Sequence, residues 1–460
     1  MSNLVAISFW ILAVWLIRKD TARRDGVSAA TWIPTLWIGI LLSRPLSMWL
    51  GFGGGDDTLE GSPLDRLFFF TMICLALITL SKRGVNWGTV IAENWPVFLF
   101  YGYLLVSVLW ADSSVVSFKR WFKDFGNIFV ALIILTEENP QQALRAVFSR
   151  CAYVMLPLSV IFVRYFPDMG RRYSRGGGLE VTGVTTQKNS LGMLVVICGL
   201  VLLWDWLEQT RNDRVHLSKI ERYLPFSFLL IGLYLLYLCN SETSIVCILI
   251  GAAVMFSTRI PMLRGRIGAL GAIILAGFAS FFVLDWLFGV KEAVIGSMGR
   301  DMTFTGRTDV WRVLLALKTD PLTGAGFCSF WSDKSYLDRL PDWVGYSAHN
   351  GYLETYIDGG FVGLFFLGVM LMALAIRTNR QLGERGNYSL LRLAAFLAIL
   401  IGDFSESHFG RMSPLFFLFL VTSLEIPWRH ESEADAERLE SIAGPAQVET
   451  SEPVRWLGTV

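Results

Sequence analysis

The side chains best suited to chemistry gather in two polar stretches of an otherwise apolar chain. The longer stretch contains Arg307 and His349, and the shorter contains Arg172 and Arg175. A guanidinium pairs bidentately with phosphate and keeps its charge at any relevant pH. An imidazole, with an ordinary pKa of about 6.5, can accept a proton at neutral pH. If both stretches lie on one side of a membrane, these residues can converge on a diphosphate at the lipid surface.

Each of these residues also has an interpretation without catalysis. The arginines of the shorter stretch could bind lipid headgroups, and a lone histidine in a loop is more often structural than catalytic. Arg307 could cap a helix, or Asp309 could be its orienting partner. Glu354 is expected in the first turns of a helix that begins near Asn350, where its charge suits the helix dipole.

Two further features of the polar regions have an expected role. Glycine lets the backbone turn sharply or approach a bulky ligand closely, and it stands in the longer stretch at positions 324, 326, 351, 359 and 360. His408 lies between Glu406 and Arg411 in a short loop, where we interpret it as part of a local ion-pair network.

The elements that must position these residues are membrane helices. Of the 460 residues, 53% are hydrophobic and only 17% are charged, whereas a soluble domain carries roughly a quarter of charged residues. Unbroken apolar runs favour helices over the alternating strands of a membrane barrel. The pattern predicts an all-α polytopic membrane protein with about 12 to 13 transmembrane helices. The apolar segments are expected near 4–17, 32–50, 66–80, 96–110, 124–136, 146–165, 190–207, 225–239, 244–257, 268–288, 360–376, 389–402 and 413–427.

The basic loops predict the orientation, because short loops rich in Lys and Arg stay in the cytoplasm. Arg23 and Arg24 follow the first segment, so the amino terminus is expected outside. Alternation then puts the two polar stretches, residues 166–189 and 289–359, outside as extracytoplasmic loops that form the active site. One basic loop conflicts with this alternation, since it also falls outside; it holds Lys119, Arg120 and Lys123.

Charge and cysteine content bound the remaining possibilities. Residues 1–428 are expected to form the transmembrane domain, and residues 429–460 an acidic, largely disordered cytoplasmic tail. The net charge of +1 gives no support for nucleic acid as a partner. The cysteines suit small buried hydrophobes, and a Cys239–Cys328 bridge is disfavoured. Without a CxxC or His/Cys cluster, a structural zinc site is not expected.

The motifs resemble those of the O-antigen ligase and polymerase superfamily. They are Thr-Gly-Arg-Thr-Asp-Val-Trp at 305–311, Pro-Leu-Thr-Gly-Ala-Gly-Phe at 321–327, Ser-Phe-Trp at 329–331 and Ala-His-Asn-Gly-Tyr-Leu at 348–353. Gly-Phe-x-x-Phe-Trp at 326–331 and Lys-Asn-Ser-Leu-Gly at 188–192 most resemble the exopolysaccharide polymerases of the succinoglycan type. Relatives of that type often carry His where this chain has Gln187.

This resemblance implies a metal-independent, inverting glycosyl transfer on the outer face of the bacterial inner membrane, in a lipid-sugar glycosyltransferase (GT-C-like) fold. The implied donor is an oligosaccharide on a polyprenyl diphosphate, and the acceptor is the growing polysaccharide. By the motifs, His349 is implied to activate the acceptor hydroxyl or assist at the diphosphate. Arg307 and either Arg172 or Arg175 are implied to bind the diphosphate. No cofactor is implied, and membrane lipids and a chain-length regulator are candidate partners.

Two other functions compete with polymerisation. An O-antigen ligase of the same superfamily transfers the glycan to lipid A-core, and the motifs do not separate the two. A transporter would carry ionisable residues or broken helices at the membrane midplane. In this chain the polar residues are concentrated in the loops, and Asp205, Asp285 and Asp403 lie near segment ends, which disfavours transport.

Overall fold

The computed structural model describes residues 2–24, 26–52, 62–173, 177–211, 219–259, 307–341, 343–382 and 387–426. Within these ranges the chain is mainly helical. The helices are α1 Ser2–Arg23, α2 Trp32–Leu41, α3 Leu46–Trp49, α4 Pro63–Lys82, α5 Trp87–Glu93, α6 Trp95–Ser107, α7 Ser114–Leu135, α8 Pro140–Tyr165, α9 Pro167–Gly170, α10 Lys188–Arg211, α11 Lys219–Cys239, α12 Glu242–Phe256, α16 Arg307–Ala316, α17 Lys334–Leu337, α18 Gly351–Gln381, α19 Asn387–Gly402 and α20 Pro414–Ser423. The 268–288 segment, the 429–460 tail and Arg175 lie outside the described residues.

The helices confirm the prediction of an all-α polytopic membrane protein. In the described part of the chain, six helices are long and apolar enough to cross a membrane, namely α4, α8, α10, α11, α12 with its following turn, and α18. A seventh is added if α5 and α6, bent by 95°, form one span. Shorter apolar helices cover Ala29–Leu41, Asn387–Gly402 and Pro414–Ser423. The total of 12 to 13 spans therefore stays a prediction.

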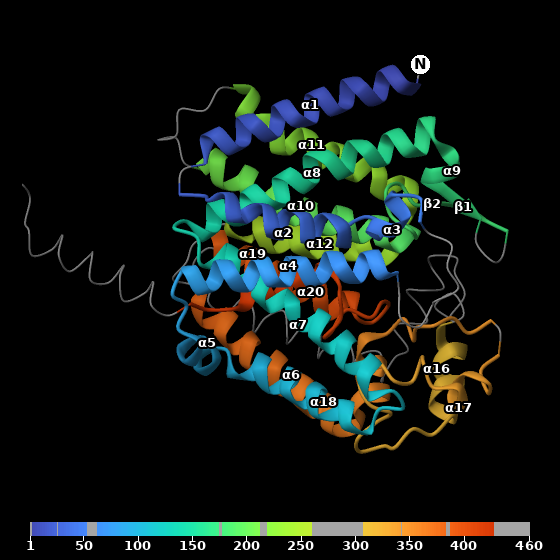
Figure 1. Ribbon diagram of the computed structural model, residues 1–460. Coiled ribbons are helices and arrows are strands. Elements are labelled where there is room, and N and C mark those ends of the chain that lie inside the picture. Colours follow the sequence, from blue (N-terminus) through green and yellow to red (C-terminus); the bar gives the residue numbers. More distant parts are fainter. Residues whose placement is uncertain are drawn as a thin grey trace, which may run out of the picture.

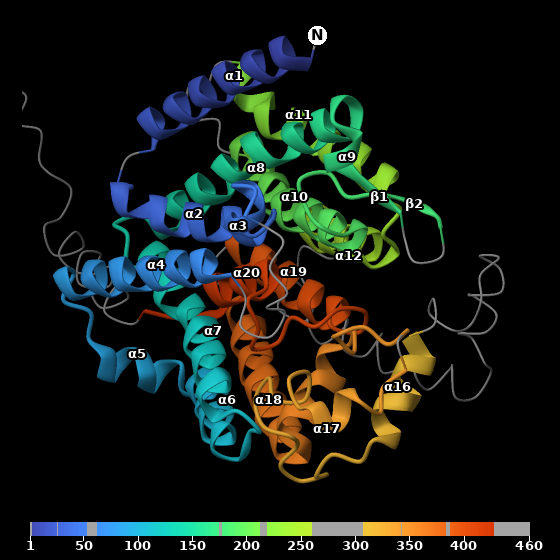
Figure 2. The same cartoon turned by 45° about the vertical axis from the view of Figure 1, so that its right-hand side comes forward.

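The helix α10 lies at the centre of the bundle. The apolar window of α10 is 89% buried, whereas that of α4 is 22% buried, so α4 presents most of its apolar surface outward, as expected for contact with lipid. Helix α10 packs against α8, α11, α12 and α19. Figures 1 and 2 show α19 and α20 lying between helices α8, α10, α11 and α12 and the inclined helices α6, α7 and α18.

Local sequence signals explain where several helices begin. Asn139 and Ser413 accept hydrogen bonds from backbone N–H groups at the first turns of α8 and α20, and a proline follows each of them. Ser62 has the same role before Pro63 at the start of α4. A polar cap followed by proline suits the free N–H groups and the fixed φ of a first helical turn.

Both polar stretches contain structure that the sequence analysis did not predict. The 166–189 stretch holds an antiparallel pair of strands, β1 Arg171–Tyr173 and β2 Leu179–Val181, with Arg172 opposite Glu180. The helix expected to begin near Asn350 is α18, which begins at Gly351 and so starts before the predicted end of the longer stretch at residue 359. A kink at Gly360, with φ 61° and ψ −158°, divides α18 at the boundary where the apolar segment was expected to begin.

The two ends of the bundle differ in character. At one end Arg83 contacts Glu137, and Arg24 hydrogen-bonds Gln142, so these basic residues meet at the turn between α7 and α8. At the opposite end Figure 1 shows α16, α17 and the β1–β2 hairpin gathered together, with the start of α1 on the same side. This separation fits the predicted alternation, while the side of the membrane stays a prediction.

Candidate functional site

A single carboxylate, Glu406, joins three segments that are far apart in the sequence. Its Oε1 accepts hydrogen bonds from Nη2 of Arg307 at 3.0 Å and from Nδ2 of Asn189 at 2.8 Å. Its Oε2 lies 3.1 Å from Nδ1 of His349. Glu406 comes from the loop between α19 and α20, Arg307 from the start of α16, and Asn189 from the first turn of α10. Arg307 and His349, predicted as site residues from separate motifs, are therefore brought together.

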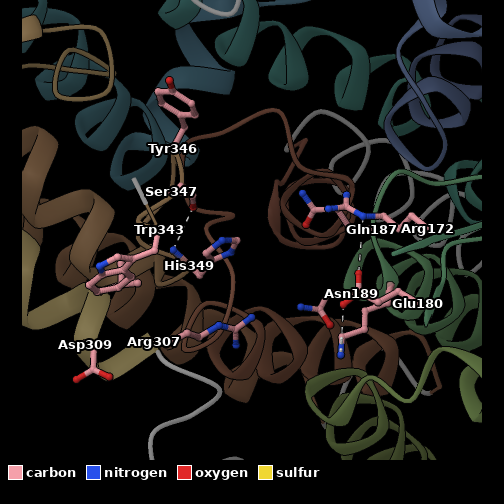
Figure 3. A pocket seen from close by; sticks show the side chains of 13 residues that line it. Arg172, Glu180, Gln187, Asn189, Arg307, Asp309, Trp343, Tyr346, Ser347 and His349 are labelled. Carbon is pink, nitrogen blue, oxygen red and sulfur yellow. Dashed lines mark hydrogen bonds and ion pairs between the residues drawn. The ribbon is translucent and has the colours of Figure 1, made fainter. Parts of the chain in front are cut away.

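Above this carboxylate lies a cavity of about 810 Å³. Arg172, Arg307 and His349 all line it, and Lys188 adds a further cation. In Figure 3 Arg172 and Arg307 point from opposite sides toward the same space, and His349 lies beside it. The predicted convergence of the two polar stretches is therefore present in the structure.

Arg172 reaches the cavity from the β1–β2 hairpin. It donates a hydrogen bond to the carbonyl of Thr186 at 3.0 Å, and its Nε lies 3.8 Å from the carboxylate of Glu180. Arg44 holds this region in place, because its guanidinium donates to the carbonyls of Gly183 at 3.1 Å and Thr185 at 3.2 Å. Arg44 stands in a short apolar loop without a motif, so its sequence context gave no signal for this role.

The Ala-His-Asn-Gly-Tyr-Leu motif holds His349 in an uncommon backbone conformation. His349 has φ 48°, in the left-handed region that few residues other than glycine adopt. Its N–H donates to Oγ of Ser347 at 3.0 Å. The next residue, Asn350, caps α18 by accepting from the N–H groups of residues 352 and 353, each at 3.0 Å. A strained residue at the end of a well-anchored helix is typical of functional sites.

Gly351 fixes this motif against the loop that carries Glu406. Its N–H donates to the carbonyls of Asp403 at 2.7 Å and Glu406 at 3.0 Å. A Cβ atom at this position would lie 1.6 Å from Oδ1 of Asp403, so only glycine allows the approach. The short distance between His349 and Glu406 therefore depends on a glycine two positions after the histidine.

The Pro-Leu-Thr-Gly-Ala-Gly-Phe motif docks on the kink of α18. The N–H groups of residues 325 and 326 donate to the carbonyls of Ile357 and Asp358, and those of residues 361 and 362 donate to the carbonyls of Pro321 and Leu322. A Cβ at Gly324 would lie 2.5 Å from the Asp358 carbonyl carbon, and one at Gly360 2.2 Å from the Leu322 carbonyl. These two glycines closely approach the protein's own backbone, and Gly351 closely approaches the Asp403 side chain, rather than a ligand.

The contacts of Asp309, Glu354 and His408 can be compared with the roles expected for them. Asp309 does not orient Arg307, because Asp309 pairs with Arg312 at 3.0 Å and points away from Arg307 in Figure 3. Glu354 lies in the first turn of α18 as predicted. His408 forms no ion pair with described residues; it is buried, its Nδ1 lies 2.6 Å from Oγ of Ser413, and burial lowers its pKa to about 4.

The charges around Glu406 explain why the carboxylate stays ionised. Burial opposes the charged form, but the hydrogen bond from His349 and the charges of His349 and Arg307 hold the pKa of Glu406 below its usual value. A carboxylate can only accept hydrogen bonds, so it selects the His349 tautomer whose Nδ1 carries the proton. The other ring nitrogen, Nε2, is then an acceptor, and no described residue hydrogen-bonds it.

The arrangement has the parts of an acid–base site for an anionic substrate. An oriented imidazole lies beside guanidinium groups that approach one cavity from two elements. Within the described ranges, no group of three or more His, Cys, Asp or Glu side chains is placed to hold a metal ion. All six cysteines are free, so Cys239 and Cys328 form no bridge.

Comparison with known proteins agrees with the motifs. Residues 226–368 match the family described as "O-Antigen ligase". The "Exopolysaccharide production protein ExoQ" of Rhizobium meliloti (strain 1021) is 23% identical over 314 residues, which cover 65% of this chain and 68% of that protein. The family match includes Arg307 and His349, which line the cavity. Both matches support the resemblance to the O-antigen ligase and polymerase superfamily that the motifs indicated.

Proposed function

We propose that this protein polymerises oligosaccharide repeat units carried on a polyprenyl diphosphate into exopolysaccharide, on the outer face of the inner membrane. The observation that carries the proposal is the Glu406–His349 pair at the edge of a cavity lined by Arg172 and Arg307. The similarity to an exopolysaccharide production protein favours polymerisation over transfer to lipid A-core. The membrane-spanning fold suits a donor that stays in the lipid.

In this mechanism His349 acts as a general base. The acceptor hydroxyl gives its proton to Nε2 of His349 while its oxygen attacks the anomeric carbon of the donor. The bond from that carbon to the diphosphate oxygen breaks, so the sugar transfers with inversion and the polyprenyl diphosphate leaves as an anion. Glu406 stabilises the imidazolium that forms, as the aspartate of a catalytic triad does.

Arg307 and Arg172 stabilise the leaving diphosphate. Arg307 contacts Glu406 through Nη2 alone, which leaves Nε and Nη1 of its planar group for phosphate oxygens. Cations held at the position where negative charge develops contribute several kcal/mol to transition-state stabilisation, about 2.7 to 4 kcal/mol for one oxyanion-hole donor. Because the energy of the reaction lies in the donor linkage, no nucleotide is required.

A deletion strain tests the reaction. It is expected to accumulate one polyprenyl-linked repeat unit and to lose high-mass polysaccharide. Accumulation of lipid-linked polymer without attachment to lipid A-core would instead identify a ligase. An unchanged lipid-linked pool would contradict both.

Two substitutions test the assigned roles in the same strain. His349→Ala is expected to lower the rate about 10²- to 10⁴-fold, and Arg307→Lys to fail in complementation, because lysine keeps the charge but loses the planar fork. Protein amounts in the membrane fraction provide the control. Full synthesis by His349→Ala would remove the residue from the mechanism, and near-normal synthesis by Arg307→Lys would leave Arg307 a structural role.

A further inference from the structure

A second cavity, of about 520 Å³, adjoins the first. Tyr346 and Ser347 line both cavities, so this short segment is a shared wall. On the far side of the wall the lining comes from other elements, including Arg120 of α7, Trp331 and Glu354. Ser347 also accepts the backbone N–H of His349. The wall between the cavities is therefore held against the backbone of His349.

The charges of the second cavity compensate one another. Arg411 lies 2.5 Å from the carboxylate of Asp358 and 3.7 Å from that of Glu354. Arg120 donates to the carbonyl of Cys328 at 2.7 Å. With the buried Asp358 counted, two guanidinium groups face two carboxylates, so the site offers hydrogen-bond donors and acceptors but little net charge for a diphosphate. It suits a polar, uncharged ligand rich in hydroxyl groups.

Aromatic rings give this cavity a second feature suited to sugars. The Trp331 indole is oriented by a hydrogen bond from its Nε1 to Glu354 at 2.9 Å. Tyr346 is 68% exposed, and in Figure 3 it points away from Arg172 and Arg307. An exposed, amphipathic ring can pack on the apolar C–H face of a sugar, while carboxylate and guanidinium groups bind its hydroxyls.

We propose that the second cavity binds the terminal sugars of the acceptor glycan, with Tyr346 as the ring on which one sugar packs. The inference rests on the proposed function, since it assigns the donor diphosphate to the first cavity. The acceptor hydroxyl then reaches His349 across the Tyr346–Ser347 wall. Separate cavities on two sides of the Tyr346–Ser347 wall allow the donor and the acceptor to be bound at the same time.

Tyr346→Ala tests this assignment in purified full-length protein. The donor is the lipid-linked repeat unit extracted from the deletion strain, and the acceptor is a two-repeat oligosaccharide released from its lipid. The KM for the acceptor is expected to rise roughly tenfold, with a smaller change in the KM for the donor. Tyr346→Phe, which keeps the ring, should remain near wild type. Tyr173→Ala is the matched control, because Tyr173 is also highly exposed, at 74%, and lines neither cavity.

A binding measurement keeps the inference independent of turnover. The soluble oligosaccharide is titrated without donor into the wild type and Tyr346→Ala, with thermal unfolding as a check on folding. Weaker binding by Tyr346→Ala supports the inference even if the wild type fails to extend the donor, a result that contradicts only the proposed function. An unchanged acceptor KM together with unchanged binding, or a change confined to the donor KM, overturns the inference.

Discussion

Glu406→Gln separates the charge of the partly buried carboxylate from its size. Glutamine keeps one acceptor oxygen but replaces the other with an NH₂ group, which can only donate. Glu406 faces donors on both oxygens, Arg307 and Asn189 on Oε1 and His349 on Oε2. If the NH₂ group faces His349, it donates to Nδ1, so the ring changes tautomer and carries its proton on Nε2. If the NH₂ group instead faces Arg307 and Asn189, it meets two groups that also donate. Either orientation damages the site.

The size of the effect follows from one lost hydrogen bond to a charged group. Such a bond contributes about 1.5 to 3 kcal/mol, and 1.36 kcal/mol corresponds to a factor of ten in rate. The rate of glycan extension is therefore expected to fall about 10- to 150-fold. The assay follows extension of the lipid-linked repeat unit by purified protein, with Glu138→Gln as the control, since Glu138 is exposed in the turn before α8. A wild-type rate for Glu406→Gln would refute the assigned role of Glu406.

The pH dependence of stability gives a second readout of the same residue. Because the pKa of Glu406 is held below its ordinary value of 4.5, the folded state favours the carboxylate. Its contribution to stability is present above pH 4.5 and is lost as the pH falls through the lower folded-state value. The difference in melting temperature between wild type and Glu406→Gln should be constant near neutral pH and shrink only below pH 4.5. A difference that already shrinks between pH 7 and 5 would show that another group dominates.

Three further predictions concern packing, metal and orientation. Gly351→Ala is expected to lower the free energy of unfolding by about 3 kcal/mol or more, because the added Cβ meets Asp403. Gly368→Ala on the same helix is the control, since its Cβ meets no atom within 4 Å and should leave the melting temperature unchanged. Extension of the lipid-linked donor should persist in EDTA, and a strict need for a divalent ion would contradict the assignment of charge stabilisation to arginine. In a cysteine-depleted protein, an impermeant maleimide should label Ser335→Cys in intact cells but Ser81→Cys only after lysis, and the opposite pattern would reverse the topology.

The helices were predictable because membrane spans depend on composition averaged over many residues. Every expected apolar segment within the described residues coincides with at least one helix. The start of α18 near Asn350 was predicted, but the kink at Gly360 was not, since it depends on contacts with residues 321–326. Such contacts join distant parts of the chain and leave no periodic pattern.

The residues of the candidate site also divide into those that the sequence indicated and those that only the fold revealed. Arg307 and His349 stand within motifs, so the sequence indicated them, but Glu406 is 57 positions from His349 in a short loop. A carboxylate there resembles any solvated loop residue until the fold buries it. Arg120 did leave a signal, because its basic loop contradicted the alternation of charge. In the structure Arg120 lines the second cavity. The basic loop that broke the predicted alternation therefore contains a residue of the candidate site region.

The motifs of the longer stretch act mainly as a scaffold for two side chains. Gly324, Gly326 and Gly360 dock one segment on the kink of α18, and Asn350 and Gly351 anchor the start of the same helix. Both motifs therefore fix the first turns of α18, which follow His349 directly. Since Glu406 also contacts Arg307, a shift of α18 would displace His349 from the carboxylate and from Arg307 at once. Most motif substitutions should therefore lower the rate of glycan transfer through position rather than through loss of a reacting group.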